Sequence, residues 1–558
     1  MAGPSAPRHP RPSRSTGSRW SLGLLVVLGG ALPWLLGCPT DDSAPTDRVA
    51  GQLPEGVALS VVVVDDPPLA TAIERLSGEW KGLTDSDLRV RRMSSAELAA
   101  AETLDADALI GPSCQVGEVA SRAELVPVPD RLLDDKERVW PGIFSLLRVR
   151  EAVWGKQTVG VPFGSPVLVV YYRADLLEEL GREPPQTWAE YRELAALFSD
   201  RKNLGEAAPP DDAPWQGAIE PLGPGWAAIV LLARAAPYVS HRENYSTVFR
   251  IDDMEPLIDG PPFVRALEEL VATASPGAPE QLTYDPAAVR AAFWEGRCAM
   301  ALTWPTAAQA PTGEDDASPP ERAAEATGSN RGGERTDGQD SAGAEGDSAN
   351  EAPPDGAPTK DAPPSDAAPS GAGLVDPLSV GLAELPGSAE NYDVAEQAWE
   401  PRREDEDPHV PLLGTAGRLG VVLRRCQWPE AAFQLLFWLS DEQSTQVSPA
   451  SPATTLFRTA HGDSPKDWVE APMPAAAAAA YAEMTRQMLC RPQWMFALRI
   501  PGRAKYLATL DEAVHRAVRG EQSPEESLRQ AAEAWRQITD ELGPERQRKA
   551  YWQSLGLE

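Results

Sequence analysis

The sequence has little of the chemistry that catalysis or metal binding requires. Only five of its 558 residues are histidine, and their scattered positions show no spacing typical of a metal site. No nucleophile motif G-x-S-x-G, no zinc motif H-E-x-x-H and no Walker phosphate loop occurs. Asp65-Asp66 and residues 404–407 hold carboxylates that a glycosidase would pair, but charge runs at loop tips more often face solvent. The sequence therefore predicts a protein without enzyme activity, metal site or cofactor.

Cysteine is also scarce. Five cysteines occur in the whole chain, and none of them forms a C-x-x-C motif or a cluster with histidine. Cys38 belongs to the N-terminal segment considered next, and the other four are Cys114, Cys298, Cys426 and Cys490. Their separations do not specify a disulfide pairing, so their redox state stays open. We expect isolated buried thiols.

Long apolar runs are confined to the N-terminus. After residue 38 no stretch approaches the roughly 20 apolar residues that span a bilayer. Four arginines between residues 8 and 19 precede an apolar run at 20–36, and Gly37-Cys38 follows it. This order resembles a bacterial lipoprotein signal, in which Cys38 is lipidated and becomes the mature N-terminus, with 39–51 as a tether. An uncleaved N-terminal anchor is the alternative, and both place the chain in the periplasm or at the cell surface.

Negative charge outweighs positive charge. The formal net charge of −32 argues against nucleic acids and anionic lipid surfaces as partners. Much of this charge lies in residues 310–373, which consist mainly of Ala, Pro, Gly, Ser, Asp and Glu. Such a segment buries too little apolar surface to offset the entropy of ordering it. We therefore expect a disordered insert within a domain, in a chain long enough for two hydrophobic cores.

The first part of the chain has the order of a parallel α/β sheet. Three apolar runs predict strands and two helical patterns separate them, at residues 57–64, 88–93 and 106–110 and at residues 69–80 and 95–104. This βαβαβ order is typical of an open, mostly parallel sheet with helices on both faces. Such sheets bind ligands beyond the carboxyl ends of their strands. Those ends are Asp65-Asp66, residues 111–113 and, later in the chain, residues 163–165.

Residues 158–197 carry the most specific pattern. The apolar run at 159–172, broken by a turn at 162–166, predicts a strand buried on both faces, as in a parallel sheet. Thr187 and Glu190 form a capping box that begins a helix. The pattern is carried by Gly160, Val161, Pro162, Gly164, Tyr171, Tyr172, Asp175, Leu176, Gly181, Pro184, Pro185, Thr187, Trp188 and Glu190. It resembles the extracellular solute-binding proteins of ABC transporters, in the sugar-binding group that includes maltose-binding protein.

Two later elements are similar to the same family. Residues 293–304 follow its F-x-x-G-x-x-A-M-x-x-x-W element, and an aromatic-rich helix at 429–439 precedes Ser440-Asp441. The resemblance implies an α/β, two-lobed periplasmic-binding-protein-like fold of type II, each lobe a mostly parallel sheet flanked by helices. Lobe 1 would comprise 52–161 and 410–452, and lobe 2 would comprise 166–405 and 453–558. The insert at 310–373 then falls within lobe 2.

The same resemblance implies a ligand cleft between the lobes. Sugars present hydroxyls to polar groups and flat C–H faces to aromatic rings. The expected ligand-binding residues are Asp65, Asp66, Ser113, Phe163, Gly164, Ser165, Trp226, Trp304 and Arg418. All of them except Phe163 also have a structural interpretation: core packing for the two tryptophans, a charge at a helix N-terminus that interacts with the macrodipole for the aspartates, turn chemistry for the serines and glycine, and a surface salt bridge for Arg418.

The function expected from the resemblance is capture of a small molecule, a carbohydrate in the first instance, and its delivery to an ABC permease by a monomer that closes about a hinge. Polyamines and iron are alternative ligands, although Tyr171 and Tyr172 lie in a strand and not at a metal-binding loop. A rival function is that of a membrane-anchored sensor or scaffold with the same fold and no role in transport.

Overall fold

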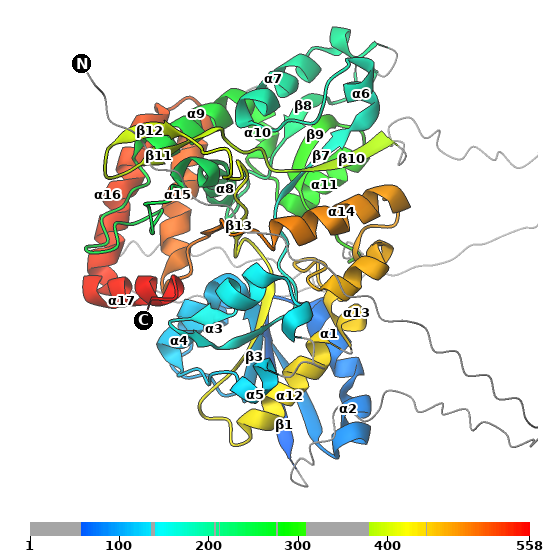
Figure 1. Ribbon diagram of the computed structural model, residues 1–558, viewed down its shortest axis with the longest axis vertical. Coiled ribbons are helices and arrows are strands. Elements are labelled where there is room, and N and C mark those ends of the chain that lie inside the picture. Colours follow the sequence, from blue (N-terminus) through cyan, green and yellow to red (C-terminus); the bar gives the residue numbers. More distant parts are fainter. Residues whose placement is uncertain are drawn as a thin grey trace, which may run out of the picture. The chain divides into compact units, whose positions relative to one another are not determined.

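The structure is a computed structural model that describes residues 57–134, 140–205, 208–210, 212–274, 277–308, 379–441 and 443–557 (Figure 1). The predicted signal segment with Cys38, the tether and the insert at 310–373 lie outside the described residues. Among the residues that are described, no helix combines the length and apolar composition needed to cross a bilayer.

The first sheet has five strands in the order β2-β1-β3-β14-β6. Their bounds are β1 Ala58–Val64, β2 Asp87–Met93, β3 Ala108–Pro112, β6 Gly160–Pro162 and β14 Arg418–Val422. β1 pairs in parallel with β2 and β3, whereas β14 is antiparallel to both β3 and β6. β14 is thus the single strand of this sheet that runs against the others. The predicted βαβαβ order is confirmed.

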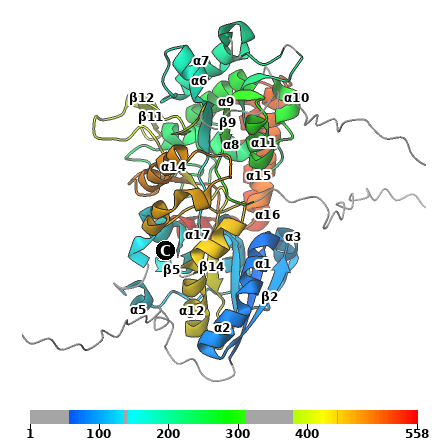
Figure 2. The ribbon, with the colours of Figure 1, turned by 90° about the vertical axis from the view of Figure 1, so that its right-hand side faces the viewer.

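Short helices connect and cover these strands. α1 (Pro67–Arg75) and α2 (Ser77–Thr84) replace the single helix predicted at 69–80, with the break at Leu76, and both lie along β2 (Figure 2). α3 (Ser95–Ala100) is shorter than predicted and begins with a capping box at Ser94. α4 (Val116–Arg122) follows β3. α12 (Pro429–Ser440) packs on β14 and β6, and α13 (Ser444–Val447) contacts α1.

The second sheet has four strands in the order β10-β7-β9-β8. Their bounds are β7 Val169–Arg173, β8 Gln216–Ile219, β9 Cys298–Thr303 and β10 Val380–Glu384. β8 and β9 are parallel, and β7 is antiparallel to both β9 and β10. β7 therefore runs against the other three strands, and the expectation that its buried pattern reflects parallel pairing was wrong. Val169, Val170 and Tyr171 are all buried because both faces of this sheet are covered, whatever the strand direction.

Helices surround the second sheet and extend to the C-terminus. They are α6 Ala174–Glu179, α7 Trp188–Ser199, α8 Ala227–Val239, α9 Pro261–Ala274, α11 Pro286–Trp294, α14 Ala475–Met488, α15 Arg503–Val518, α16 Pro524–Leu542 and α17 Pro544–Ser554. The predicted capping box at Thr187 and Glu190 begins α7. Every residue of α8 is buried, since α9, α15 and a two-stranded hairpin all pack against it. The hairpin consists of β11 (Glu390–Asp393) and β12 (Ala398–Pro401).

The chain passes between the two sheets more than once. It leaves the first sheet after β6, returns to it at β14 and leaves it again after α13. In the third connection a short strand, β15 (Met495–Phe496), pairs in parallel with β13 (Leu412–Leu413). The four cysteines within the described residues are free thiols, and three of them are buried as expected. Cys490 is exposed because it follows the end of α14, so the expectation of burial was wrong there.

Candidate functional site

The two aspartates after β1 are both engaged within the protein. Asp66 is the N-cap of α1, where its Oδ1 accepts from the backbone N–H of Leu69 at 3.1 Å. Asp65 has a φ of 50°, and its carboxylate accepts hydrogen bonds from both the backbone N–H, at 2.8 Å, and the hydroxyl of Ser95. These bonds join the carboxyl ends of β1 and β2.

Arg418, the first residue of β14, reaches the same place. Its Nε donates to Oδ2 of Asp66 at 2.8 Å, and its Nη2 donates to the carbonyl of Asp65 at 3.0 Å. The hydroxyl of Ser451 donates to the same Asp66 oxygen. The Arg418 and Asp66 side chains are only 7% and 1% exposed. Arg418 therefore forms a buried ion pair, which neither the ligand-contact nor the surface salt-bridge interpretation anticipated.

Ser113 and Ser165 converge on a carboxylate that no pattern in the sequence had indicated. Both hydroxyls donate to Oε1 of Glu151, the Ser165 bond measuring 2.8 Å, and all three residues are buried. Nη2 of Arg499 donates to the backbone carbonyl of Glu151 at 2.8 Å. Glu151 thus ties together the end of β3, the connection after β6 and the segment before α15.

The buried Glu151 carboxyl makes stability depend on pH. Burial raises its pKa, and hydrogen bonds from Ser113 and Ser165 and the charge of Arg499 oppose that rise. Because the folded state then holds this proton more tightly than the unfolded chain, the folded state loses stability as pH rises above the unfolded pKa of about 4.3.

We therefore expect the free energy of unfolding of Glu151→Gln to rise relative to that of wild type as the pH increases from about 4.3 to the pKa of the folded state, as urea denaturation at several pH values will measure. A difference between the two proteins that stays constant over this range would contradict the raised pKa.

The connection after β6 is closely packed. Phe163 is fully buried, and its ring lies beside Gly420 of β14. Gly164 has a φ of 111°, and a Cβ at this position would lie 2.6 Å from the carbonyl oxygen of Thr455. Gly164 and Thr455 belong to two different connections between the sheets, so this glycine lets the two connections approach each other.

The two predicted stacking residues lie together. The rings of Trp226, at the start of α8, and Trp304, just after β9, are 5.5 Å apart and inclined by 47°. Trp304 is 4% exposed and Trp226 is half-buried. Nε1 of Trp304 donates to the carbonyl of Pro452 at 3.0 Å. Pro452 follows Ser451, so the tryptophan pair and the Asp66–Arg418 pair share one short segment of chain.

The start of α8 is held by a carboxylate from α15. Oδ2 and Oδ1 of Asp511 accept from the backbone N–H groups of Gly225 and Ala228, each at 2.7 Å. Burial raises the pKa of Asp511, whereas these two hydrogen bonds lower it. The contact fixes Trp226 relative to α15.

A pocket of about 690 Å³ opens between α3 and α4 on one side and the starts of α15 and α17 on the other. Its polar lining includes Ser95, Gln115, Glu118, Arg503 and Lys505. Gln115 donates to Ser95, which in turn donates to Asp65, so the pocket adjoins the strand ends. Sequence reasoning missed these residues, since polar side chains on short helices carry no local signal for a pocket.

Residues 115–370 match the model of the family described as bacterial extracellular solute-binding protein. This match confirms the predicted resemblance to bacterial extracellular solute-binding proteins. The chain has the two-lobed solute-binding protein fold, as predicted. The family comprises binding proteins and not enzymes, which agrees with the expectation from the sequence.

Solved structures of solute-binding proteins share this fold. The sugar-binding protein MalE from Xanthomonas citri is 15% identical with a TM-score of 0.55, over 87% of this solute-binding protein and 98% of that chain. An ABC transporter solute-binding protein from Agrobacterium radiobacter K84, in complex with ribitol, is 16% identical with a TM-score of 0.54. The alignment covers 87% of this chain and 99% of that chain. Another from Agrobacterium vitis S4, with bound D-mannitol, is 14% identical with a TM-score of 0.53. The alignment covers 88% of this chain and 99% of that chain. At these identities the similarity shows the fold alone. No curated protein matches the sequence significantly.

Proposed function

We propose that this solute-binding protein captures a carbohydrate or polyol between its lobes and delivers it to an ABC permease. The observation that carries the proposal is the Trp226–Trp304 pair, joined through Pro452 and Ser451 to the polar strand ends. Aromatic faces stack on the C–H faces of sugars, and fixed polar groups bind their hydroxyls. Ribitol, D-mannitol and sugars are the ligands named for proteins of similar fold.

The predicted site residues then take two roles. We propose that Trp226 and Trp304 contact the solute, together with polar residues of the adjoining pocket such as Gln115 and Lys505. The other predicted residues shape the floor of the cleft. Their polar groups form hydrogen bonds within the protein, or the residues are buried: Asp65, Asp66, Ser113, Phe163, Gly164, Ser165 and Arg418. The lobes would be 52–161 with 410–452 and 166–405 with 453–558, and Cys38 would carry the lipid.

Burial of Tyr171 also argues against iron as the ligand. Tyr171 is fully buried, and its hydroxyl donates to Oε1 of Glu470 at 2.9 Å. Burial also raises the pKa of Tyr171 well above its usual value, so the phenolate that iron requires is suppressed.

A thermal-shift screen tests the carbohydrate proposal. The panel comprises ribitol, mannitol, maltose and maltotetraose, with spermidine and Fe(III) citrate as the alternative ligand classes. We expect a carbohydrate or polyol to raise the Tm, by the equivalent of about 2.7 kcal/mol when its concentration is 100 times Kd. Trp304→Ala and Trp226→Ala should each weaken its binding about tenfold or more, because a stacking face is lost.

Trp428→Ala is the matched control, since Trp428 is 42% exposed and precedes α12 on the first sheet. It should leave the affinity unchanged. Full affinity in both Trp226→Ala and Trp304→Ala would refute the site, and a panel without any stabilising sugar or polyol would favour the sensor or scaffold alternative.

A further inference from the structure

Three side chains far apart in the sequence meet beside the end of α8. His241 follows α8, Asp393 ends β11 and Glu400 lies in β12. One potential ligand atom from each lies within 4.8 Å of the others, and within the described residues this is the one such group of histidine and carboxylates. Nε2 of His241 is 3.2 Å from Oε2 of Glu400, and Nδ1 is 3.9 Å from Oδ2 of Asp393. The group lies apart from the proposed solute site.

The register of the hairpin adds a fourth group. Asn391 is directly opposite Glu400 and two residues from Asp393, so all three share one face of the hairpin, while Tyr392 and Trp399 share the other. Asn391 is fully buried. Its Nδ2 donates to the carbonyl of Ser240 at 3.1 Å, which places the amide next to His241. Its Oδ1 has no hydrogen-bond partner. A buried carbonyl oxygen without a partner is costly unless something binds it.

Hydrogen bonds to the backbone hold Asp393 and the hairpin in position. Oδ1 of Asp393 accepts from the backbone N–H groups of Ala395 and Glu396, at 2.8 and 3.2 Å, which leaves Oδ2 directed to His241. Nδ2 of Asn244 donates to the carbonyl of Tyr392 at 2.9 Å and so fastens the hairpin to the turn after α8.

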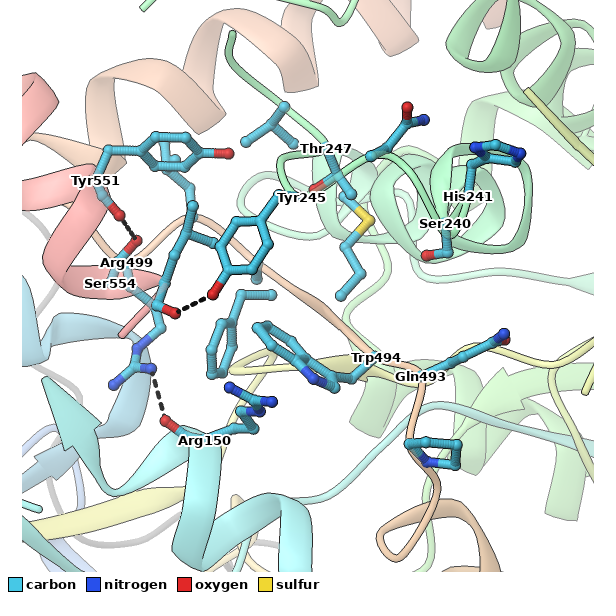
Figure 3. A pocket seen from close by; sticks show the side chains of 18 of the residues that line it. Arg150, Ser240, His241, Tyr245, Thr247, Gln493, Trp494, Arg499, Tyr551 and Ser554 are labelled. Atoms are coloured by element: carbon cyan, nitrogen blue, oxygen red, sulfur yellow. Dashed lines mark hydrogen bonds between the residues drawn. The ribbon is translucent and has the colours of Figure 1, made fainter. Parts of the chain in front are cut away.

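His241, Ser240 and Arg242 also help to line a neighbouring pocket of about 240 Å³, and the His241 side chain itself is buried. In Figure 3, His241 and Ser240 lie on the side of this pocket away from Arg499, with Trp494 and Tyr245 between them.

One cation competes for the same oxygen. Nη2 of Arg242 donates to Oε2 of Glu400 at 2.7 Å, and this bond is the main cause that lowers the pKa of Glu400. Nη1 of Arg242 is 3.9 Å from Oε1 of Glu406, which gives the guanidinium a second carboxylate to pair with if Glu400 binds another cation. The backbone N–H of Glu243 donates to Nδ1 of His241 at 3.3 Å, a long bond that is easily exchanged.

We propose that His241, Asp393 and Glu400, with Oδ1 of Asn391, bind a divalent transition-metal ion that pins the hairpin to the end of α8. One imidazole and three oxygens suit Zn²⁺ and Co²⁺, whereas Ca²⁺ and Mg²⁺ prefer oxygen ligands alone. Two carboxylates supply the negative charge that a divalent ion requires. The site is structural and does not depend on which solute the protein carries.

Calorimetric titration of the chelator-treated full-length protein with Zn²⁺, repeated with Co²⁺ and read by visible absorption, tests the proposal. We expect one high-affinity ion per chain and a Tm increase of about 2–4 °C. His241→Gln and Glu400→Gln should each lower the affinity at least about 100-fold, and Arg242→Gln should raise it about tenfold, because the competing cation is gone.

His409→Gln is the matched control, because His409 pairs with Asp407 at 3.1 Å and lies outside this group. This variant should bind the metal ion with the affinity of wild type. Should His241→Gln fail to fold, Glu400→Gln, whose side chain is one third exposed, carries the test. The site is wrong if Glu400→Gln binds the metal ion with wild-type affinity, or if His409→Gln loses as much affinity as Glu400→Gln. It is also wrong if neither wild type nor Arg242→Gln shows saturable binding. None of these readouts involves a sugar, so they stand apart from the solute proposal.

Discussion

Replacing Asp66 by alanine is expected to lower the free energy of unfolding by about 3–5 kcal/mol. The carboxylate does three things at once: it caps α1 through the backbone N–H of Leu69, pairs with Arg418 and accepts from Ser451. Without it, Arg418 keeps the carbonyls of Asp65 and Gly417 but no carboxylate. A guanidinium buried without its counter-charge bears a desolvation cost that nothing offsets.

Urea denaturation followed by tryptophan fluorescence measures this loss. Asp87→Ala is the matched control, because Asp87 also pairs with a cation, Lys81 at 2.7 Å, but the two side chains are 56% and 59% exposed. Solvent screens that pair, so its removal should change stability by less than about 1 kcal/mol. An equally small loss for Asp66→Ala would mean that the Arg418–Asp66 pair is solvated in solution.

Gly164→Ala should also be strongly destabilising, by about 2–5 kcal/mol. The φ of 111° is one that alanine rarely adopts, and the new Cβ would lie 2.6 Å from the carbonyl oxygen of Thr455 and 3.1 Å from its backbone nitrogen. Neither atom is the end of a flexible side chain, so relief requires one inter-sheet connection to move away from the other. The same displacement would disturb lobe closure, and we expect weaker solute binding along with the lower stability.

Gly181→Ala separates strain from crowding. Gly181 also has a positive φ, 59°, but no atom lies within 4 Å of the added Cβ. Its replacement should cost only about 1 kcal/mol, from backbone conformation alone. Equal losses for the two variants would show that crowding against Thr455 contributes nothing at residue 164.

Local patterns were sufficient for most of the secondary structure. The run of valines in β1 and the capping box of Thr187 and Glu190 act over a few residues, and the structure confirms both of them. The break between α1 and α2 at Leu76 was not predicted, because helical patterning is continuous across it. β7 was assigned as a buried strand but with the wrong pairing, since burial on both faces does not encode direction.

The chemistry of the site was decided by contacts between distant segments. Arg418 lies 352 residues from Asp66, and Ser113 lies 38 residues from Glu151, so no spacing in the sequence links them. The same holds for His241 and Glu400, 159 residues apart, which the hairpin brings together. Patterning along the chain reflects which side of an element is buried, and this was sufficient to predict strands and helices of the two sheets, while specific residues such as Gly164 and Trp188 carried the family resemblance. The partner of each buried charge depends on how elements from separate parts of the chain pack, and only the folded structure supplies that.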